Sequence, residues 1–166
     1  YATRVGSGPF PTELFDETGR GIAERGREFG TVTGRARRVG WFDTVPLRYA
    51  VAVNSNSAIV LNKLDILSGI ESIRLCVAYQ IDGRRVDTWP SSGSALSRAV
   101  PIYEDFEGWE EPIHDVRSLA GLPENARRYV SALEEHAGVP IVFVSVGPER
   151  TQTIERAWRP MRHRPT

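Results

Sequence analysis

The chain has 166 residues, 40% of them hydrophobic and 25% charged, which is enough for one globular domain with a core of its own. Its 21 basic and 21 acidic side chains cancel, which excludes a broad electrostatic surface for nucleic acid or an anionic membrane. The single cysteine, Cys76, excludes an internal disulfide framework and a cysteine metal cluster, and is compatible with a cytoplasmic location. No apolar run approaches the roughly 18 residues of a membrane span.

The first part of the chain predicts two helices. Turn residues followed by scattered apolar positions predict a loop that leads into a short helix around residues 18–28. Asp43 is placed to cap a second helix, over about residues 44–53, which has Pro46 in its first turn. Leu47, Ala50 and Val51 fall at helical spacing on one face of this helix.

Three continuous apolar runs, residues 58–61, 73–79 and 139–144, predict buried strands of a parallel sheet. Between the last two, an amphipathic helix is predicted that ends near Gly138, with a buried face formed by Ala126, Tyr129, Val130, Leu133 and Ala137. The polar stretch over residues 87–98 is interpreted as a surface loop. The sequence therefore predicts an α/β fold with a mostly parallel sheet and flanking helices.

The segment Asn62-Lys63-Leu64-Asp65 follows the first of these strands, at the edge where ligand sites of α/β sheets gather. A carboxylate here can accept hydrogen bonds from both N1–H and the N2 amino group of guanine, whereas adenine has no matching pair of donors. The aliphatic part of Lys63 can lie along the base, while its ammonium group stays solvated or helps to position the loop. Such a segment is also common in charged turns that bind nothing.

A second segment combines glycines, hydroxyl side chains and arginines: Gly30, Thr31, Thr33, Gly34, Arg35, Arg37 and Arg38. Glycines allow the backbone to approach a ligand closely, and guanidinium groups bind carboxylate or phosphate oxygens in pairs. By composition alone this could be a solvated basic turn. Because Phe29 and Trp41 anchor its two ends, we interpret it as a loop that binds a small dianion.

A third segment, Ser145-Val146-Gly147-Pro148, follows the last predicted strand, and its backbone amides would be free to face a ligand beside Lys63. It could be a plain turn, but two strand exits at one edge begin to define a pocket. The three histidines have no metal-ligand spacing, and the acidic residues 104–111 are interpreted as a surface turn. No phosphate-binding glycine loop and no catalytic triad occur, so binding residues are present without an evident catalyst.

Taken in order, these motifs resemble adenylosuccinate synthetase. The resemblance covers almost the whole chain and rests on residues 3–13 (TRVGSGPFPTE), 30–41, 62–65 (NKLD), 75–79 (LCVAY) and 145–148 (SVGP). It implies a part of a larger, P-loop-NTPase-like α/β domain. It also implies a cytoplasmic homodimer that uses GTP and Mg²⁺ to join IMP and L-aspartate through 6-phosphoryl-IMP, giving adenylosuccinate in de novo AMP synthesis.

The resemblance also implies roles for individual positions. The loop that closes over the aspartate carboxylates would consist of Thr31, Val32, Thr33, Gly34, Arg35, Ala36 and Arg37. Arg35 would also lie near IMP, Arg37 would also serve GTP, and the carbonyl of Val5 would contact the IMP ribose. The guanine site would consist of Lys63, Leu64, Asp65, Ser145, Val146 and Gly147. Many members have two adjacent threonines where this chain has Val32-Thr33, so a hydroxyl contact at Val32 is lost.

The catalytic centre of the family has no counterpart in this sequence. The family's phosphate-binding glycine loop, the aspartate that acts as general base and binds Mg²⁺, and the supporting histidine all lie upstream of the matched region. The chain starts at Tyr1 and not at Met, which we interpret as a cut within a longer protein. We therefore expect residues 1–166 to be a C-terminal portion that binds substrates but is inactive alone.

Two other functions remain open on the sequence alone. A freestanding, non-catalytic module that binds a guanine nucleotide or a small dicarboxylate would use the same residues. A nucleic-acid-binding domain would use Arg35, Arg37 and Arg38, but the net charge of zero and the lack of aromatic side chains among these arginines disfavour it.

Overall fold

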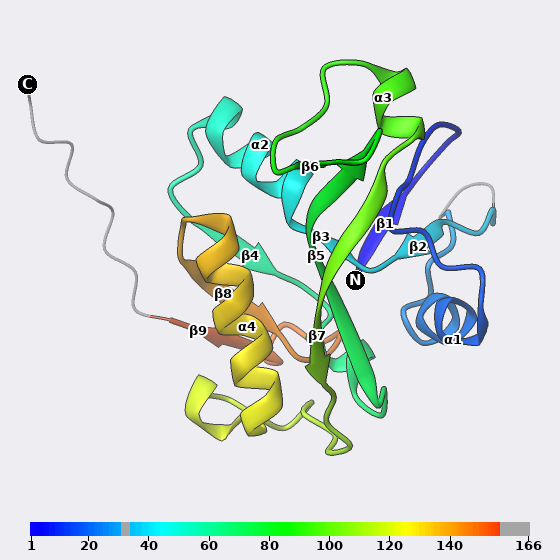
Figure 1. Cartoon of the computed structure of the whole chain (residues 1–166). Coiled ribbons are helices and arrows are strands. Elements are labelled where there is room, and N and C mark those ends of the chain that lie inside the picture. Colours follow the sequence, from blue (N-terminus) through cyan, green and yellow to red (C-terminus); the bar gives the residue numbers. More distant parts are fainter. Residues whose placement is uncertain (31–33, 157–166) are drawn as a thin grey trace, which may run out of the picture.

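The computed structural model describes residues 1–30 and 34–156, which form an α/β fold with helices packed among small sheets (Figure 1). The described strands are β1 (Ala2–Arg4), β2 (Arg38–Gly40), β3 (Phe42–Asp43), β4 (Ile59–Leu61), β5 (Ser72–Ile81), β6 (Arg84–Val86), β7 (Val100–Glu107), β8 (Ile141–Ser145) and β9 (Thr153–Glu155). The described helices are α1 (Glu17–Arg25), α2 (Thr44–Asn54), α3 (Gly93–Ser97) and α4 (Glu124–Ala137), with 3-10 turns η1 (Leu64–Leu67) and η2 (Leu119–Gly121).

The strands form sheets of mixed direction. β3 pairs with β5 and β4 pairs with β8 in parallel, whereas β5 pairs antiparallel with both β6 and β7, β8 with β9, and β1 with β2. The α/β class is as expected, but the described strands are not mostly parallel. For β6 the reason is the turn at Asp82 and Gly83, whose positive φ angles of 50° and 79° make a tight hairpin and return the chain beside β5.

Three local interpretations are wrong. The acidic stretch assigned to a surface turn begins in β7, which pairs along most of β5 and places Phe106 against the core. The stretch assigned to a surface loop contains α3, which is capped by the Ser92 hydroxyl and buries Leu96. β5 and β8 lie in different sheets, so α4 connects β7 to β8 and does not link two strands of one sheet.

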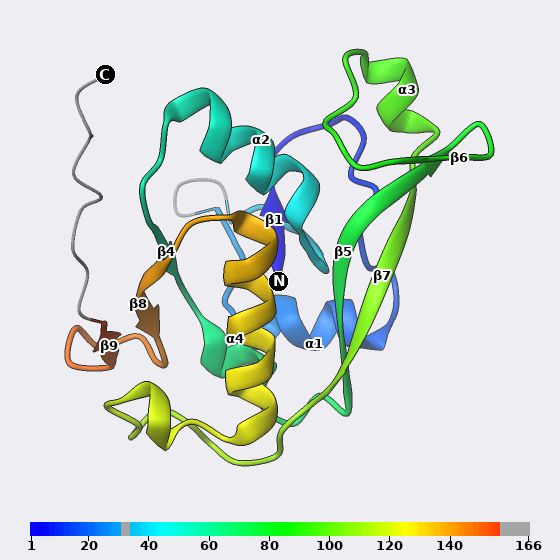
Figure 2. The ribbon, with the colours of Figure 1, turned by 60° about the vertical axis from the view of Figure 1, so that its left-hand side comes forward.

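The longer helices lie where their caps and periodicity predict them. α4 buries Ala126, Tyr129, Val130, Leu133 and Ala137, and it ends at Gly138, which has a left-handed φ of 70°. Figure 2 shows this helix between the β5–β7 ribbon and β8, and its apolar face belongs to a core cluster that includes residues of both sheets. No helix among the described residues is long and apolar enough to span a membrane.

Asp43 starts α2 and holds it against β5. One carboxylate oxygen accepts a hydrogen bond from the Val45 amide at 3.0 Å, and the other accepts one from the Tyr79 hydroxyl at 2.5 Å. Asp43 and Tyr79 are both buried. Thr44 extends the same contact, because its hydroxyl donates to the Cys76 carbonyl at 2.8 Å.

Replacing Asp43 with Ala should lower the free energy of unfolding by about 2–4 kcal/mol, because the helix loses its cap and the Tyr79 hydroxyl is left unpaired in the core. Urea denaturation measures this change. The control is Asp105→Ala, which removes an exposed pair with Arg74 and should cost less than about 0.5 kcal/mol. Equal losses in the two variants would show that the buried contact does not stabilise the fold.

Candidate functional site

The segments after β4 and β8 meet at one edge, because these two strands pair in parallel from Ile59 with Ile141 to Leu61 with Val144, with a register shift between Ile59 and Val60. They line a pocket of about 270 Å³ together with the end of α1. Its lining residues are Arg25, Gly26, Arg27, Lys63, Asp65, Ile66, Gly147 and Pro148. The structure therefore brings together three of the residues expected to bind guanine, namely Lys63, Asp65 and Gly147.

Asp65 gives this pocket an acceptor with unused hydrogen-bonding capacity. It lies in the first turn of η1, and its Oδ1 is buried without a hydrogen-bond partner among the described residues. Burial raises the pKa of this carboxyl above its usual value, while the nearby Lys63 charge opposes the rise. A ligand that donates N–H groups to Asp65 would satisfy the oxygen and favour its ionised form.

The Lys63 ammonium group is bound to the segment that follows α1. Its backbone is left-handed, with φ 60° and ψ 39°, and its ammonium donates to the Gly26 carbonyl at 2.8 Å and to Glu28 Oε1 at 2.6 Å. Of the two roles open to this ammonium, the structure supports positioning of the loop. The contacts also fix the distance between η1 and the end of α1.

Glu28 is a buried carboxylate, 2% exposed, that accepts hydrogen bonds from three separate segments. Oε1 accepts from Lys63 and, at 2.6 Å, from the Tyr1 hydroxyl, while Oε2 accepts from Arg37 Nη1 at 2.9 Å. Burial opposes ionisation of Glu28, but the hydrogen bonds from Lys63, Tyr1 and Arg37 outweigh it and hold the pKa below the ordinary value of 4.5. The group is therefore a carboxylate at neutral pH.

The C-terminal end of α1 directs Glu28 inward. The Glu28 amide bonds to the Ala23 carbonyl at 2.9 Å and the Arg27 amide bonds to the Glu24 carbonyl at 3.1 Å, which is the Schellman pattern of helix ends. The left-handed position in this pattern is taken by Arg27, with φ 49°, although glycine is the residue that adopts it without strain. The chain turns sharply there, and Glu28 enters the core one residue later.

The arginine segment forms a hairpin whose base includes Glu28. The Arg37 amide bonds to the Glu28 carbonyl at 2.8 Å, and the Gly30 amide bonds to the Arg35 carbonyl at 2.7 Å. Gly34 has φ 63° and, like Arg35 and Ala36, is exposed. Three of the expected loop residues, Thr31, Val32 and Thr33, lie outside the described residues.

The other three residues expected at the guanine site, Leu64, Ser145 and Val146, do not line the pocket. The Leu64 side chain is 1% exposed and packs in the core, so it does not line the pocket. The expectation of free amides after β8 is wrong for Val146, whose N–H donates to the Gln152 carbonyl at 2.9 Å because the chain turns back into β9. The Ser145 hydroxyl donates to the Gly147 carbonyl at 2.9 Å and supports the same turn.

Val5 lies directly after β1 and is 80% exposed, so its backbone is open to a ligand. The adjoining loop is held by Arg38, which donates to the carbonyls of Gly6 and Gly8 and pairs with Glu13. Arg38 therefore braces the loop after β1, whereas Arg37 faces Glu28.

Sequence reasoning did not identify Glu28, Arg25 or Arg27 as site residues. Arg25 and Arg27 line the pocket, and Arg25 also donates to the Ser68 carbonyl at 2.6 Å. The only hint of a role for Glu28 in the sequence is that it is the last acidic residue before Arg35, Arg37 and Arg38. Its neighbours in the sequence do not indicate that it is buried.

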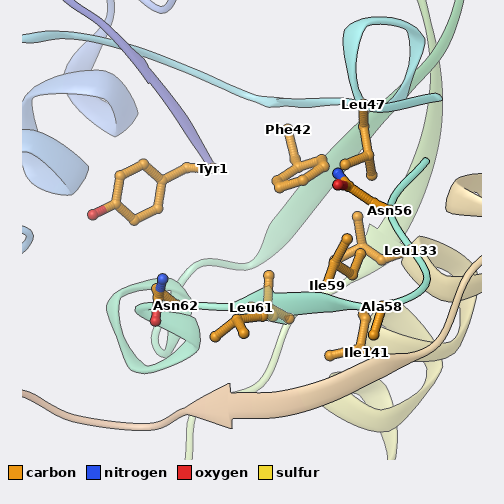
Figure 3. Close-up of a pocket in the computed structure, with 11 residues that line it drawn as sticks. Tyr1, Phe42, Leu47, Asn56, Ala58, Ile59, Leu61, Asn62, Leu133 and Ile141 are labelled. Atoms are coloured by element: carbon orange, nitrogen blue, oxygen red, sulfur yellow. The ribbon is translucent and has the colours of Figure 1, made fainter. Parts of the chain in front are cut away.

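A larger cavity, of about 490 Å³, opens between the two parallel strand pairs. Figure 3 shows Phe42 of β3 and Leu47 of α2 on one side of it, and Ile59 and Leu61 of β4 on the other. Leu47 is half-buried in this structure. Among the described strands, β3 pairs only with β5 and β4 only with β8, so each has an unpaired edge.

Comparison with known proteins shows the family to which the chain belongs. The adenylosuccinate synthetase family model matches residues 1–154. The chain belongs to the adenylosuccinate synthetase family. It is 55% identical over 155 residues to the adenylosuccinate synthetase of Chromohalobacter salexigens, covering 93% of this chain and 36% of that protein. It is 52% identical over 160 residues to that of Streptococcus gordonii, covering 95% of this chain and 37% of the relative.

The fold of the family is shared as well. A solved structure of fully ligated adenylosuccinate synthetase from Plasmodium falciparum is similar with a TM-score of 0.91 and 42% sequence identity, over 95% of this chain and 38% of that one. The chain thus spans somewhat more than a third of the length of the relatives that it matches.

The Glu28 cluster should make stability depend on pH in a defined direction. Because the pKa of Glu28 is lowered in the folded protein, its contribution is complete above the ordinary value of 4.5 and is lost as the pH falls through the lower folded-state value. The Glu28→Gln variant lacks this contribution. Urea unfolding from pH 7 downward should show a difference between the two proteins that shrinks below about pH 4.5. A difference that is constant across this range would contradict the assignment.

Proposed function

We propose that this chain is the C-terminal portion of an adenylosuccinate synthetase. The complete enzyme would couple IMP and L-aspartate to form adenylosuccinate, with cleavage of GTP to GDP and phosphate. The observation that carries the proposal is the buried, unpartnered Oδ1 of Asp65 in a pocket shared with Lys63 and Gly147. It supplies an acceptor for a base that presents neighbouring N–H groups.

Guanine matches this pocket and adenine does not. The N1–H and N2 amino groups of guanine would both donate to the Asp65 carboxylate, whereas adenine presents an N1 lone pair that would face the same negative oxygens. Ile66 and Pro148 offer apolar surface beside the base. Arg25 and Arg27 at the pocket place positive charge near a bound nucleotide.

The arginine hairpin would bind the second substrate. In this proposal residues 31–37 close over L-aspartate, with Arg35 and Arg37 directing guanidinium groups at its carboxylates. Arg35 would also reach IMP, Arg37 the GTP side, and the Val5 carbonyl the IMP ribose. Support comes from the exposure of Arg35 and Val5 and from the anchoring of Arg37 on Glu28.

The rest of the reaction would depend on protein outside this chain. Among residues 1–30 and 34–156, no three His, Cys, Asp or Glu side chains converge in a way that could hold a metal ion. We therefore assign no step on this chain to Mg²⁺ and infer that the remainder of the enzyme holds it, together with the phosphate-binding loop. The apolar cavity between β3 and β4 is suited to packing of that remainder. We further infer a cytoplasmic enzyme that acts as a homodimer.

Asp65→Asn in the full-length enzyme should weaken selection for guanine. The amide offers one acceptor and one donor where the carboxylate offers two acceptors, so the KM for GTP should rise about 10- to 100-fold. Steady-state kinetics with GTP and with inosine triphosphate, which lacks the N2 amino group, measures the effect. The ratio of kcat/KM values for the two nucleotides should fall toward one in the variant.

The matched control for this substitution is Asp105→Asn, an exposed position on β7 that is absent from the pocket lining. It should leave the kinetics with both nucleotides unchanged. If Asp65→Asn keeps the discrimination between GTP and inosine triphosphate, Asp65 does not read the base and the guanine assignment is wrong.

A further inference from the structure

We propose that Glu28 is a positioning residue that couples the arginine hairpin to the guanine pocket, so that binding at one site changes the affinity of the other. This inference rests on the function proposed above. It concerns a residue that is not proposed to contact either substrate directly. Glu28 lies between the two sites and contacts a residue of each.

The two contacts use different oxygens of one carboxylate. Oε1 accepts from Lys63 at 2.6 Å, and Lys63 lines the pocket beside Asp65. Oε2 accepts from Arg37 at 2.9 Å, at the base of the arginine hairpin. A rotation of the carboxylate that improves one contact changes the other, which gives the two segments a direct mechanical link.

Burial makes this link stronger than a surface ion pair. The Glu28 side chain is 3% exposed, whereas those of Arg37 and Lys63 are 34% and 43% exposed, so the cations can move and the anion cannot reach water. If the ammonium of Lys63 shifts on nucleotide binding, the buried negative charge must be compensated by Arg37 and the Tyr1 hydroxyl. The position of Arg37, and with it that of the hairpin, therefore depends on whether the guanine pocket is occupied.

The backbone reinforces the same path. The Glu28 carbonyl accepts from the Arg37 amide at 2.8 Å, and the Gly26 carbonyl accepts from the Lys63 ammonium at 2.8 Å. Residues 26–28 thus contact the hairpin on one side and the guanine segment on the other through both main chain and side chain. Equilibrium coupling must act in both directions, so aspartate would strengthen GTP binding by the same factor as GTP strengthens aspartate binding.

A carboxylate elsewhere in the chain provides a matched control with a purely structural contact. Glu134 of α4 is also partly buried, and its Oε1 accepts from the Ile141 amide at 2.9 Å and from Arg156 Nη1 at 2.6 Å. These two partners, Ile141 and Arg156, lie outside the guanine pocket and the arginine hairpin. Glu134→Gln therefore removes the charge of a partly buried carboxylate that accepts two hydrogen bonds, without touching the path through Glu28.

The test uses the full-length enzyme with Glu28→Gln, Lys63→Met, the double variant and Glu134→Gln, and it measures kcat and the KM values for GTP and aspartate. Glu28→Gln should raise both KM values about 10-fold, because a charge-assisted hydrogen bond is lost on each side. Lys63→Met should raise the KM for aspartate as well as that for GTP. The double variant should resemble Glu28→Gln alone for aspartate, because the two residues act through one contact. Glu134→Gln should leave both KM values within about twofold.

Two results would overturn the coupling. One is a Lys63→Met variant that raises the KM for GTP and leaves the KM for aspartate unchanged. This result would support the guanine site but would contradict the coupling between the two sites. The other is a Glu28→Gln variant that behaves like Glu134→Gln. If Glu28→Gln does not fold, the effect of Lys63→Met on the KM for aspartate decides alone. If neither Lys63→Met nor Asp65→Asn changes the KM for GTP, the failure lies in the proposed guanine site and not in the coupling.

Discussion

A single buried negative charge organises the functional edge of this fold. The Glu28 carboxylate is withdrawn from water, and an uncompensated carboxylate in such a position costs several kcal/mol. Its compensation requires Tyr1 and Lys63 to converge from segments that are distant in sequence, together with Arg37 from the other arm of the hairpin that Glu28 begins. That requirement holds three segments close together: the end of α1, the arginine hairpin and the segment after β4.

The arginine hairpin shows how neighbouring residues of one type acquire different roles. Arg37 directly precedes β2 and Arg38 is its first residue, and the side chains of these neighbours extend to opposite sides. Arg37 faces Glu28, and Arg38 crosses to Glu13 and the loop after β1. The hairpin is thus anchored on both faces, and the exposed Arg35 lies outside both anchors. A composition-based description of a basic turn does not distinguish these three positions.

The parts of the fold that sequence predicts well are those governed by neighbours along the chain. α2 and α4 follow from the cap at Asp43, the spacing of apolar residues and the glycine at Gly138. β7 was missed because its second half is acidic, with Glu104, Asp105 and Glu107 around the apolar Phe106, so this stretch was interpreted as a surface turn. The meeting of the segments after β4 and β8 was predictable from the parallel-sheet rule. The burial of Glu28 was not, because two of its partners, Tyr1 and Lys63, come from segments that are remote in sequence.

The parallel pairing of β4 with β8 also has a consequence for how the protein folds. Ile59 and Ile141 are brought together across about half of the chain, with β5, β6, β7 and α4 lying between them in sequence. Closing so large a loop is entropically unfavourable until the intervening elements have formed, so contacts of this kind are made late. The β5–β6 hairpin and α4 are local structures that can form early. The walls of the pocket around Asp65 would therefore be among the last surfaces to assemble during synthesis and refolding.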